Sequence, residues 1–188
     1  MLKYIEETGK YVEITAFRRA RISKVEDLLR AVDREKPRHV WVQFFDAELV
    51  ATWQHLYFAV FNALVASKNA RNISKNPAME VMLYASAQHQ IRKAIDLLGV
   101  KCGSGDVAAV IIGENPEHVK VVLAAVSAAI GVAPDDTALE LSDKKIQRIR
   151  EAFEISDKEL EAVKEKDNIG QALIKLVIER VALLATQV

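Results

Sequence analysis

The sequence predicts an α+β fold, in which a small mixed or antiparallel sheet of about three to four strands packs with about seven helices around a long central helix. Three observations predict it: short apolar runs of strand length, longer segments with helical spacing, and Asn-Pro pairs of the kind at which helices begin. With 188 residues, the chain has the length of one globular domain, which we place over residues 1–188.

The longest helical pattern follows Asp46, and the other elements are arranged around it. We expect Asp46 to cap this helix after a strand over residues 39–45 that lies inside the sheet. Further apolar residues, Phe58 among them, widen the apolar face, which predicts a helix that is buried on several sides. The residues that define this face by their spacing are Leu49, Trp53, Leu56, Val60 and Leu64.

Three other segments have strand patterns. Residues 10–22 begin with alternating apolar and polar side chains, which predicts an exposed strand. Residues 106–113 form an apolar run that is typical of a strand inside a sheet. A short edge strand is expected at residues 138–141, within the long connection that follows residue 131.

Capping signals predict where the other helices begin and end. Ser23 opens a Ser-Lys-Val-Glu capping box, and two Asn-Pro pairs place an Asn cap before a proline at the first helical position. The helix that ends at Gly99 should turn Ile91, Ile95 and Leu98 inward. One C-terminal helix should run through Lys166, and the last should cover residues 169–186. The expected caps are Ser23, Asn76, Asn115, Ser142 or Asp143, and Ser156.

Composition excludes several classes of protein. Hydrophobic residues make up 51% and charged residues 28% of the chain, as in ordinary globular proteins. The formal net charge is zero, so any contact with nucleic acid must come from a local patch. A single cysteine, Cys102, allows no internal disulfide. No segment approaches the roughly 18 apolar residues of a membrane span. We therefore expect a cytoplasmic protein without a membrane contact.

Residues 46–91 carry a resemblance to a known family. An aromatic strand ending in Asp46-Ala47 is followed by a series of short motifs: His55-Leu56, Asn62-Ala63, Ile73-Ser74-Lys75, Met79-Glu80, Leu83-Tyr84-Ala85-Ser86 and Gln90-Ile91. In this order and spacing, the motifs resemble the small kinase-binding regulatory subunit of the KEOPS (EKC) complex, in its archaeal form. The chain departs from the family at residues 87–89, where a Gly followed by an Arg is expected and neither is present.

The resemblance implies a noncatalytic role without a cofactor. In that family the subunit binds the amino-terminal lobe of the complex's small atypical protein kinase and supports the activity of that kinase. In archaea it also holds tRNA by the single-stranded 3′ CCA end. The complex as a whole takes part in the threonylcarbamoyladenosine modification of tRNA.

A basic cluster around residues 68–75 is the candidate tRNA contact. Cationic and amide side chains on a loop between helices suit a phosphodiester backbone and the edges of bases, and Tyr84 could supply a stacking face. A solvated basic loop explains the same pattern equally well. The candidate tRNA-binding residues are Lys68, Arg71, Lys75, Arg92 and Asn62.

The helix after Pro77 is the candidate kinase contact. Its apolar content, together with that of the last helix, exceeds what one small sheet can cover, and uncovered apolar surface marks interfaces. We expect Val81 and Tyr84 to lie to the side of this helix, at the surface. The candidate kinase-binding residues are Val81, Tyr84 and Met79.

Two alternatives remain open from the sequence. The first is a small enzyme with a site near His55 and the Gly103–Gly105 turn, although the four histidines have no metal-site spacing. A core histidine with its N–H satisfied is the favoured interpretation of His55. The second is a self-associating helical module without any RNA contact.

Overall fold

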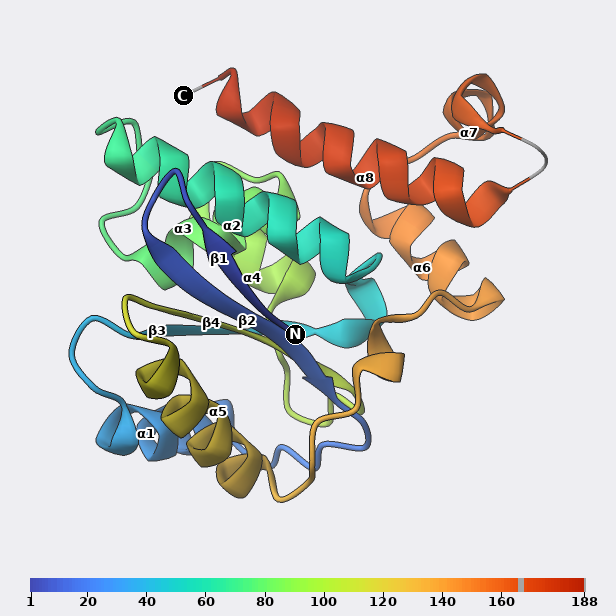
Figure 1. Ribbon diagram of the computed structural model, residues 1–188. Coiled ribbons are helices and arrows are strands. Elements are labelled where there is room, and N and C mark those ends of the chain that lie inside the picture. The colour runs from blue at the N-terminus through green and yellow to red at the C-terminus, as the bar shows by residue number, and fades with distance from the viewer. Residues whose placement is uncertain (166–167, 188) are drawn as a thin grey trace.

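The structure, a computed structural model, describes residues 1–165 and 168–187, in which one sheet lies between two layers of helices (Figure 1). The sheet order is β1-β2-β4-β3, and each neighbouring pair is antiparallel. The strands are β1 (Leu2–Ile5), β2 (Lys10–Phe17), β3 (Trp41–Asp46) and β4 (Val107–Gly113).

β4 lies inside the sheet, and all of its residues are buried. Because successive side chains of a strand point to opposite faces, β4 contributes to two separate cores. Val110 and Ile112 belong to the core on one side, whereas Val107, Ala109 and Ile111 belong to the core on the other. Both faces are thus covered, which explains the continuous apolar run and confirms the interior strand predicted there.

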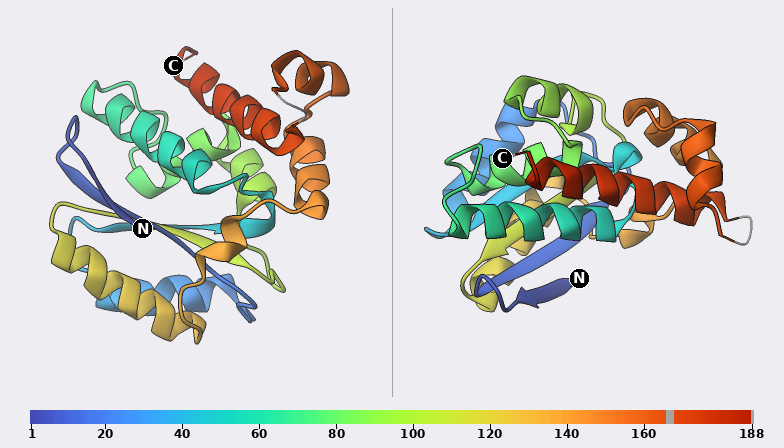
Figure 2. Two further views of the ribbon diagram at one scale, coloured as in Figure 1. Left: turned by 45° about the vertical axis from the view of Figure 1, so that its right-hand side comes forward. Right: turned by 90° about the horizontal axis from the view of Figure 1, so that it is seen from above.

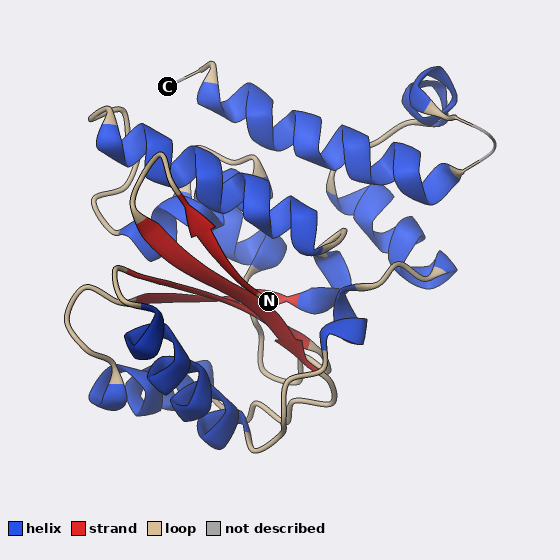
Figure 3. Ribbon diagram, in the orientation of Figure 1, coloured by secondary structure: helices blue, strands red, loops and turns tan. Residues whose placement is uncertain are grey.

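Helices cover the two faces of the sheet unequally (Figure 2). One face is covered by α1 (Val25–Glu35) and α5 (Pro116–Ile130), and the other faces a larger group of helices. Over the described residues, eight α-helices and four antiparallel strands confirm the α+β class, and Figure 3 shows the helices on both sides of the strands. The larger group comprises α2 (Trp53–Lys68), α3 (Pro77–Ser86), α4 (Ile91–Leu98), α6 (Asp143–Ala152), α7 (Asp157–Val163) and α8 (Ile169–Ala185), with the short 3₁₀ turns η1 (Ala47–Leu49) and η2 (Asp136–Leu139).

The central helix α2 packs against both α3 and α8, which runs beside it (Figures 1 and 2). Its inward face is buried, as the sequence predicts, and includes Leu56, Val60 and Leu64. α3 is covered even more completely: every residue from Glu80 to Ser86 is buried. α3 lies among β3, α2, α4 and α8, so little of its surface reaches solvent.

The strand predictions need four corrections. β3 pairs with β4 alone and lies at the edge of the sheet, not inside it. β2 is buried from Val12 to Phe17, because β1 and β4 flank it and helices cover both faces, and the strand ends at Phe17. β1 was not among the strands expected. Residues 136–139 form a 3₁₀ turn in place of an edge strand.

The capping predictions are confirmed at Asn76, Asn115, Ser142 and Ser156, each of which accepts a backbone amide at a helix start. Two others are wrong. Asp46 caps the turn η1, and α2 begins only at Trp53, behind Thr52. The N-cap of α1 is Lys24, so Ser23 forms no capping box.

The inward face of α4 differs from the expected one. On α4 the inward residues are Ala94 and Leu98, while Ile91 and Ile95 are 47% and 42% exposed. Leu98 is therefore inward as expected, whereas the inward position of Ile91 and Ile95 was wrong and Ala94 lies inward instead. α7 covers Asp157–Val163, and the predicted end of this helix at Lys166 lies outside the described residues. Among the helices of the described residues, none is long and apolar enough to cross a membrane.

Candidate functional site

The loop of residues 69–75 joins α2 to α3 and presents basic side chains to solvent. Lys68, Arg71 and Lys75 are all exposed. Nζ of Lys68 donates to the carbonyl of Glu7 at 2.6 Å, in the turn between β1 and β2. The side chains of Arg71 and Lys75 form no hydrogen bond or ion pair with any other described residue. Two cations of this loop are therefore available to a ligand.

A buried carboxylate holds the backbone of this loop. Glu80 of α3 is fully buried, and its two oxygens accept the amides of Ile73 at 3.0 Å and Ser74 at 2.6 Å. Such charge-assisted bonds to backbone amides are among the stronger hydrogen bonds in proteins. Nδ2 of Asn72 also donates to the carbonyl of Ser74 at 2.9 Å. The loop thus has a fixed backbone beneath free cationic side chains.

Just after the C-terminal ends of α2 and α3, alanine occupies positions where glycine is the usual residue. Ala70 and Ala87 have φ values of 56° and 51°, in the left-handed region. At the end of α2, the amide of Arg71 donates to the carbonyl of Ala66 at 2.9 Å. At the end of α3, the amide of Gln88 donates to the carbonyl of Leu83 at 3.0 Å. Both patterns are those of a Schellman motif.

The other two candidate tRNA-binding residues lie away from the loop. Arg92 is exposed in the first turn of α4, beyond the opposite end of α3. The ten residues of α3 separate it from the loop by about 15 Å of helix. Asn62 is half-buried on α2, where its Nδ2 donates to the carbonyl of Phe58 at 2.8 Å. The structure therefore brings Lys68, Arg71 and Lys75 together but not Arg92.

The predicted surface position of two kinase-binding candidates is wrong. Val81 and Tyr84 are 0% and 1% exposed, because the neighbouring strand and helices cover α3 on all sides. Met79 is half-buried against the same core. The apolar residues of α3, which we interpreted as a surplus at the surface, instead fill the core between the sheet, α2 and α8.

Exposed apolar side chains lie instead on the outward face of α2 and on α8. Phe58 is 40% exposed, and Phe61 and Val65, three and seven positions further on, are half-buried on the same face. On α8, Leu183 is 43% exposed. In the sequence, Phe58 widens the apolar face of this helix. We interpreted this as a sign that the helix is buried on several sides, whereas it marks an exposed apolar face.

His55 is a core residue, as the favoured interpretation of the sequence has it. It is fully buried, and its Nδ1 accepts the amide of Ala51 at 3.3 Å. Nε2 lies 2.7 Å from the carbonyl of Ala85 and so carries the proton, which fixes a neutral ring. Burial lowers the pKa of His55 to about 4, outweighing the bond to Ala85. Both ring nitrogens are used in holding α2 to its neighbours.

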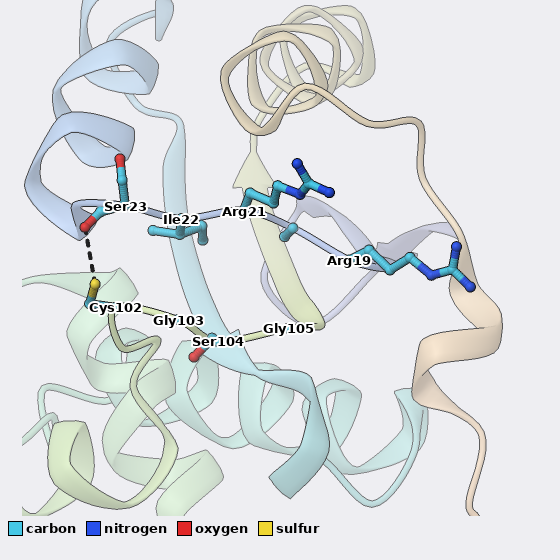
Figure 4. A pocket seen from close by; sticks show the side chains of 9 residues that line it. Arg19, Arg21, Ile22, Ser23, Cys102, Gly103, Ser104 and Gly105 are labelled. Atoms are coloured by element: carbon cyan, nitrogen blue, oxygen red, sulfur yellow. Dashed lines mark hydrogen bonds between the residues drawn. The ribbon is translucent and has the colours of Figure 1, made fainter.

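The Gly103–Gly105 turn lies away from His55. It lines an open pocket together with residues 19–23, the segment between β2 and α1 (Figure 4). His55 does not line this pocket. The structure thus separates the two features that the alternative of an enzyme site joined. Among the described residues, no three His, Cys, Asp or Glu side chains are grouped so that they could hold a metal ion.

Lys145 is a buried polar residue that the sequence did not single out. It is 3% exposed, and its Nζ donates to the carbonyls of Ala138 at 2.9 Å and Glu140 at 3.4 Å. Burial lowers its pKa to about 8, against the attraction of Glu48 and other carboxylates. The residue ties α6 to the turn η2. Its position in a charged helix gave no sign of this, because solvated lysines have the same spacing.

Two comparisons with known proteins indicate the family to which the chain belongs. The family model described as kinase binding protein CGI-121 matches residues 19–185, which is most of the chain. The chain is also 33% identical over 111 residues to regulatory protein Cgi121 of the archaeon Methanocaldococcus jannaschii. That match spans 59% of this chain and 68% of the relative. On these grounds, the chain belongs to the CGI-121 family of kinase-binding proteins.

Proposed function

We propose that this protein is a noncatalytic, cytoplasmic adaptor of the KEOPS tRNA-modification complex. In this role it binds the small atypical protein kinase of the complex and holds tRNA by its 3′ CCA end. The observation that carries the proposal is the match of a kinase-binding family across residues 19–185. The name of the archaeal relative, a regulatory protein, agrees with a role that supports another protein's activity.

For the kinase contact we propose the outward face of α2 and the adjoining part of α8. Phe58 is the most exposed aromatic residue of α2, and Phe61 and Val65 extend the same apolar face along the helix. Leu183 adds exposed apolar surface on α8, which packs against α2. Aromatic residues are enriched among the few side chains that carry most of the energy of an interface. The buried Val81 and Tyr84 then support this surface from beneath, without touching the kinase.

For the tRNA contact we propose the loop of residues 69–75, with Lys68 at its start. Its free cations, Arg71 and Lys75, suit the phosphates of a single strand. Its backbone is already fixed by Glu80, so the loop loses little conformational entropy when it binds. Asn62 lies six residues before Lys68 on α2 and would contact the strand only at the border with the kinase surface. Arg92 would contact it only if the RNA extends past α3.

The departure from the family at residues 87–89 affects this proposal in one respect. The expected glycine is replaced by Ala87, yet Ala87 still adopts the left-handed conformation that a glycine would favour. The shape of the turn is therefore kept without the glycine. The missing arginine removes one cation at this turn, and the nearest exposed cation that follows is Arg92.

The experiment that tests the tRNA contact changes Arg71 and Lys75 together to Glu. Both side chains are exposed and form no hydrogen bond or ion pair with another described residue, so the fold should be unaffected. Binding of tRNA should weaken strongly, and wild-type affinity should fall with salt at a slope near −3 if about four phosphates are neutralised. The matched control is Arg34→Glu with Arg38→Glu, two exposed cations elsewhere. Full binding by the loop variant, or unchanged binding of tRNA that lacks its CCA end, would refute this contact.

A further inference from the structure

A second basic segment lies outside the surfaces discussed so far. The connection between β2 and α1 holds four basic residues and no carboxylate: Arg18, Arg19, Arg21 and Lys24. The loop of residues 101–105 lies beside it, adding Lys101 and no carboxylate. Because the whole chain has a formal net charge of zero, this concentration of positive charge is a local feature.

These two segments enclose an open pocket of about 580 Å³ (Figure 4). Two hydrogen bonds hold its walls together. The amide of Gly103 donates to the carbonyl of Ile22 at 3.3 Å, and Sγ of Cys102 donates to the carbonyl of Ser23 at 3.2 Å. The pocket is therefore formed before any ligand arrives, which lowers the entropic cost of binding.

The cationic rim of the pocket is free to bind a ligand. Arg19 and Arg21 are exposed, and their guanidinium groups have no hydrogen bond or ion pair with another described residue. Arg18, by contrast, donates to the carbonyl of Thr137 at 3.1 Å. In Figure 4 the side chains of Arg19 and Arg21 extend outward from their segment, away from the loop of residues 102–105. Unpaired guanidinium groups are well suited to bidentate bonds with phosphate.

The opposite wall offers backbone and hydroxyl donors. A Cβ atom added to Gly103 or Gly105 would meet nothing within 4 Å, so a ligand can approach the backbone closely here. The amide of Gly105 donates to no other described residue. Oγ of Ser104 accepts the amide of Lys101 at 3.0 Å, which leaves its own O–H available as a donor. The nearby carboxylate of Asp106 is occupied by the amide of Arg19 at 2.9 Å.

The buried side of the pocket is apolar. Ala20 and Ile22 line it and are only 3% and 7% exposed. An apolar floor beside cationic and amide donors matches a molecule with one flat, weakly polar part and one anionic part. A nucleoside phosphate has both, and the volume is within the range of small-molecule sites.

We propose that this pocket binds a nucleoside phosphate, with the base against Ala20 and Ile22 and the phosphate at the Gly105 amide, toward which the exposed side chains of Arg19 and Arg21 turn when the ligand binds. A free nucleotide and a nucleotide within an RNA strand present the same chemistry, so either can be the source. The proposal depends neither on the loop of residues 69–75 nor on the kinase surface. Its failure would leave the proposed function unchanged.

Cys102 provides the test, because it is the chain's single cysteine, is exposed, and lines the pocket. The rate of its alkylation by iodoacetamide is measured by mass spectrometry with ADP, with a single-stranded oligoribonucleotide, and without either. Occupancy of the pocket should slow alkylation severalfold. Changing Arg19→Gln and Arg21→Gln together should abolish the protection, which is measured for each variant as the ratio of its liganded to its own unliganded alkylation rate, because nearby cations also affect thiol reactivity. The control pair Arg34→Gln and Arg38→Gln, exposed arginines outside the pocket, should keep the protection.

The outcomes distinguish a free nucleotide from an RNA strand as the ligand, or show that the pocket binds neither. Protection by ADP that needs Arg19 and Arg21 identifies a free nucleotide as a ligand. Protection by the oligoribonucleotide alone, with the same dependence, identifies an RNA strand. Alkylation that neither probe slows would overturn the proposal, as would full protection in the Arg19→Gln, Arg21→Gln variant.

Discussion

Nε2 of His55, in the central helix, lies 2.7 Å from the carbonyl oxygen of Ala85, near the end of α3. This bond joins α2 and α3, the two helices that flank the basic loop. α2 also carries the outward face proposed for the kinase. Nδ1 of the same ring accepts the amide of Ala51, and this second bond exists only while the ring is neutral, whereas a protonated ring would still donate to Ala85. The bond between α2 and the segment just before it is therefore linked to the protonation state of His55.

The first prediction concerns the pH dependence of stability. Burial lowers the pKa of His55 to about 4 from 6.5, so between these values the unfolded chain binds a proton that the folded chain does not. The free energy of unfolding that depends on the neutral His55 ring is fully present above pH 6.5. It decreases as the pH falls toward 4, by about 3 kcal/mol in all. Denaturant unfolding measured from pH 4 to 7 should show this slope in the wild type. It should be absent in His55→Asn and kept in His118→Asn, an exposed control; equal slopes in all three would contradict the prediction.

The second prediction concerns Glu80. Replacing it with Gln leaves one carbonyl oxygen for the two amides of Ile73 and Ser74 and turns an NH₂ group toward the other amide. An unsatisfied buried donor costs about 1–3 kcal/mol, so the loop should loosen and the amides of both residues should exchange faster in hydrogen-exchange measurements.

Binding of tRNA should weaken in Glu80→Gln although the change removes no positive charge, because the loop loses its fixed backbone. Glu161→Gln, at an exposed carboxylate on α7, serves as the control and should bind like the wild type. Unaltered exchange at Ile73 and Ser74 would show that Glu80 does not hold the loop.

The third prediction concerns the two alanines in the left-handed region. Ala70→Gly and Ala87→Gly should each raise the free energy of unfolding by up to about 1 kcal/mol, because glycine adopts positive φ without the steric cost that Cβ imposes. Ala63→Gly, inside α2, is the control and should lower it by about 1 kcal/mol. Thermal melts decide the matter: destabilisation by all three changes would mean that these turns do not hold the conformations seen here.

Much of the fold could be predicted from local patterns, because those patterns have local causes. The Asn76-Pro77 and Asn115-Pro116 starts, for example, depend on a cap and a proline that act within one turn. The strand at residues 107–113 has a run of apolar residues that only a doubly covered position explains.

What could not be predicted depends on contacts between distant residues. The short segment 2–5 becomes a strand only because it pairs with residues 10–13, and its pairing helps to bury β2. Val81 and Tyr84 have the same helical spacing whether α3 lies at the surface or, as it does, among three other helices and a strand. Glu80 looked like an ordinary surface carboxylate, since the amides it accepts belong to a loop whose path the sequence does not reveal.

The composition of the sequence identified the candidate loop, but it did not indicate that the loop lies apart from Arg92. Sequence distance from Lys75 to Arg92 is short, yet a buried helix lies between them. Composition likewise identified an apolar excess without saying which face would remain uncovered. Phe58 was visible as an extra apolar residue on α2, and only the packing of α2 against α3, α8 and β2 decides that it faces outward.

The most direct test of the account measures kinase binding by a Phe58→Glu variant, using the small atypical kinase of the same organism and size-exclusion chromatography of the mixture. A charge at the centre of an apolar interface is desolvated without a partner, so the complex should be lost. The matched control is Val121→Glu, at an exposed apolar residue of α5 on the other side of the sheet. The account predicts that Phe58→Glu melts like the wild type, binds tRNA normally and fails to bind the kinase, whereas Val121→Glu binds both. A Phe58→Glu protein that forms the complex as well as the Val121→Glu control would contradict it.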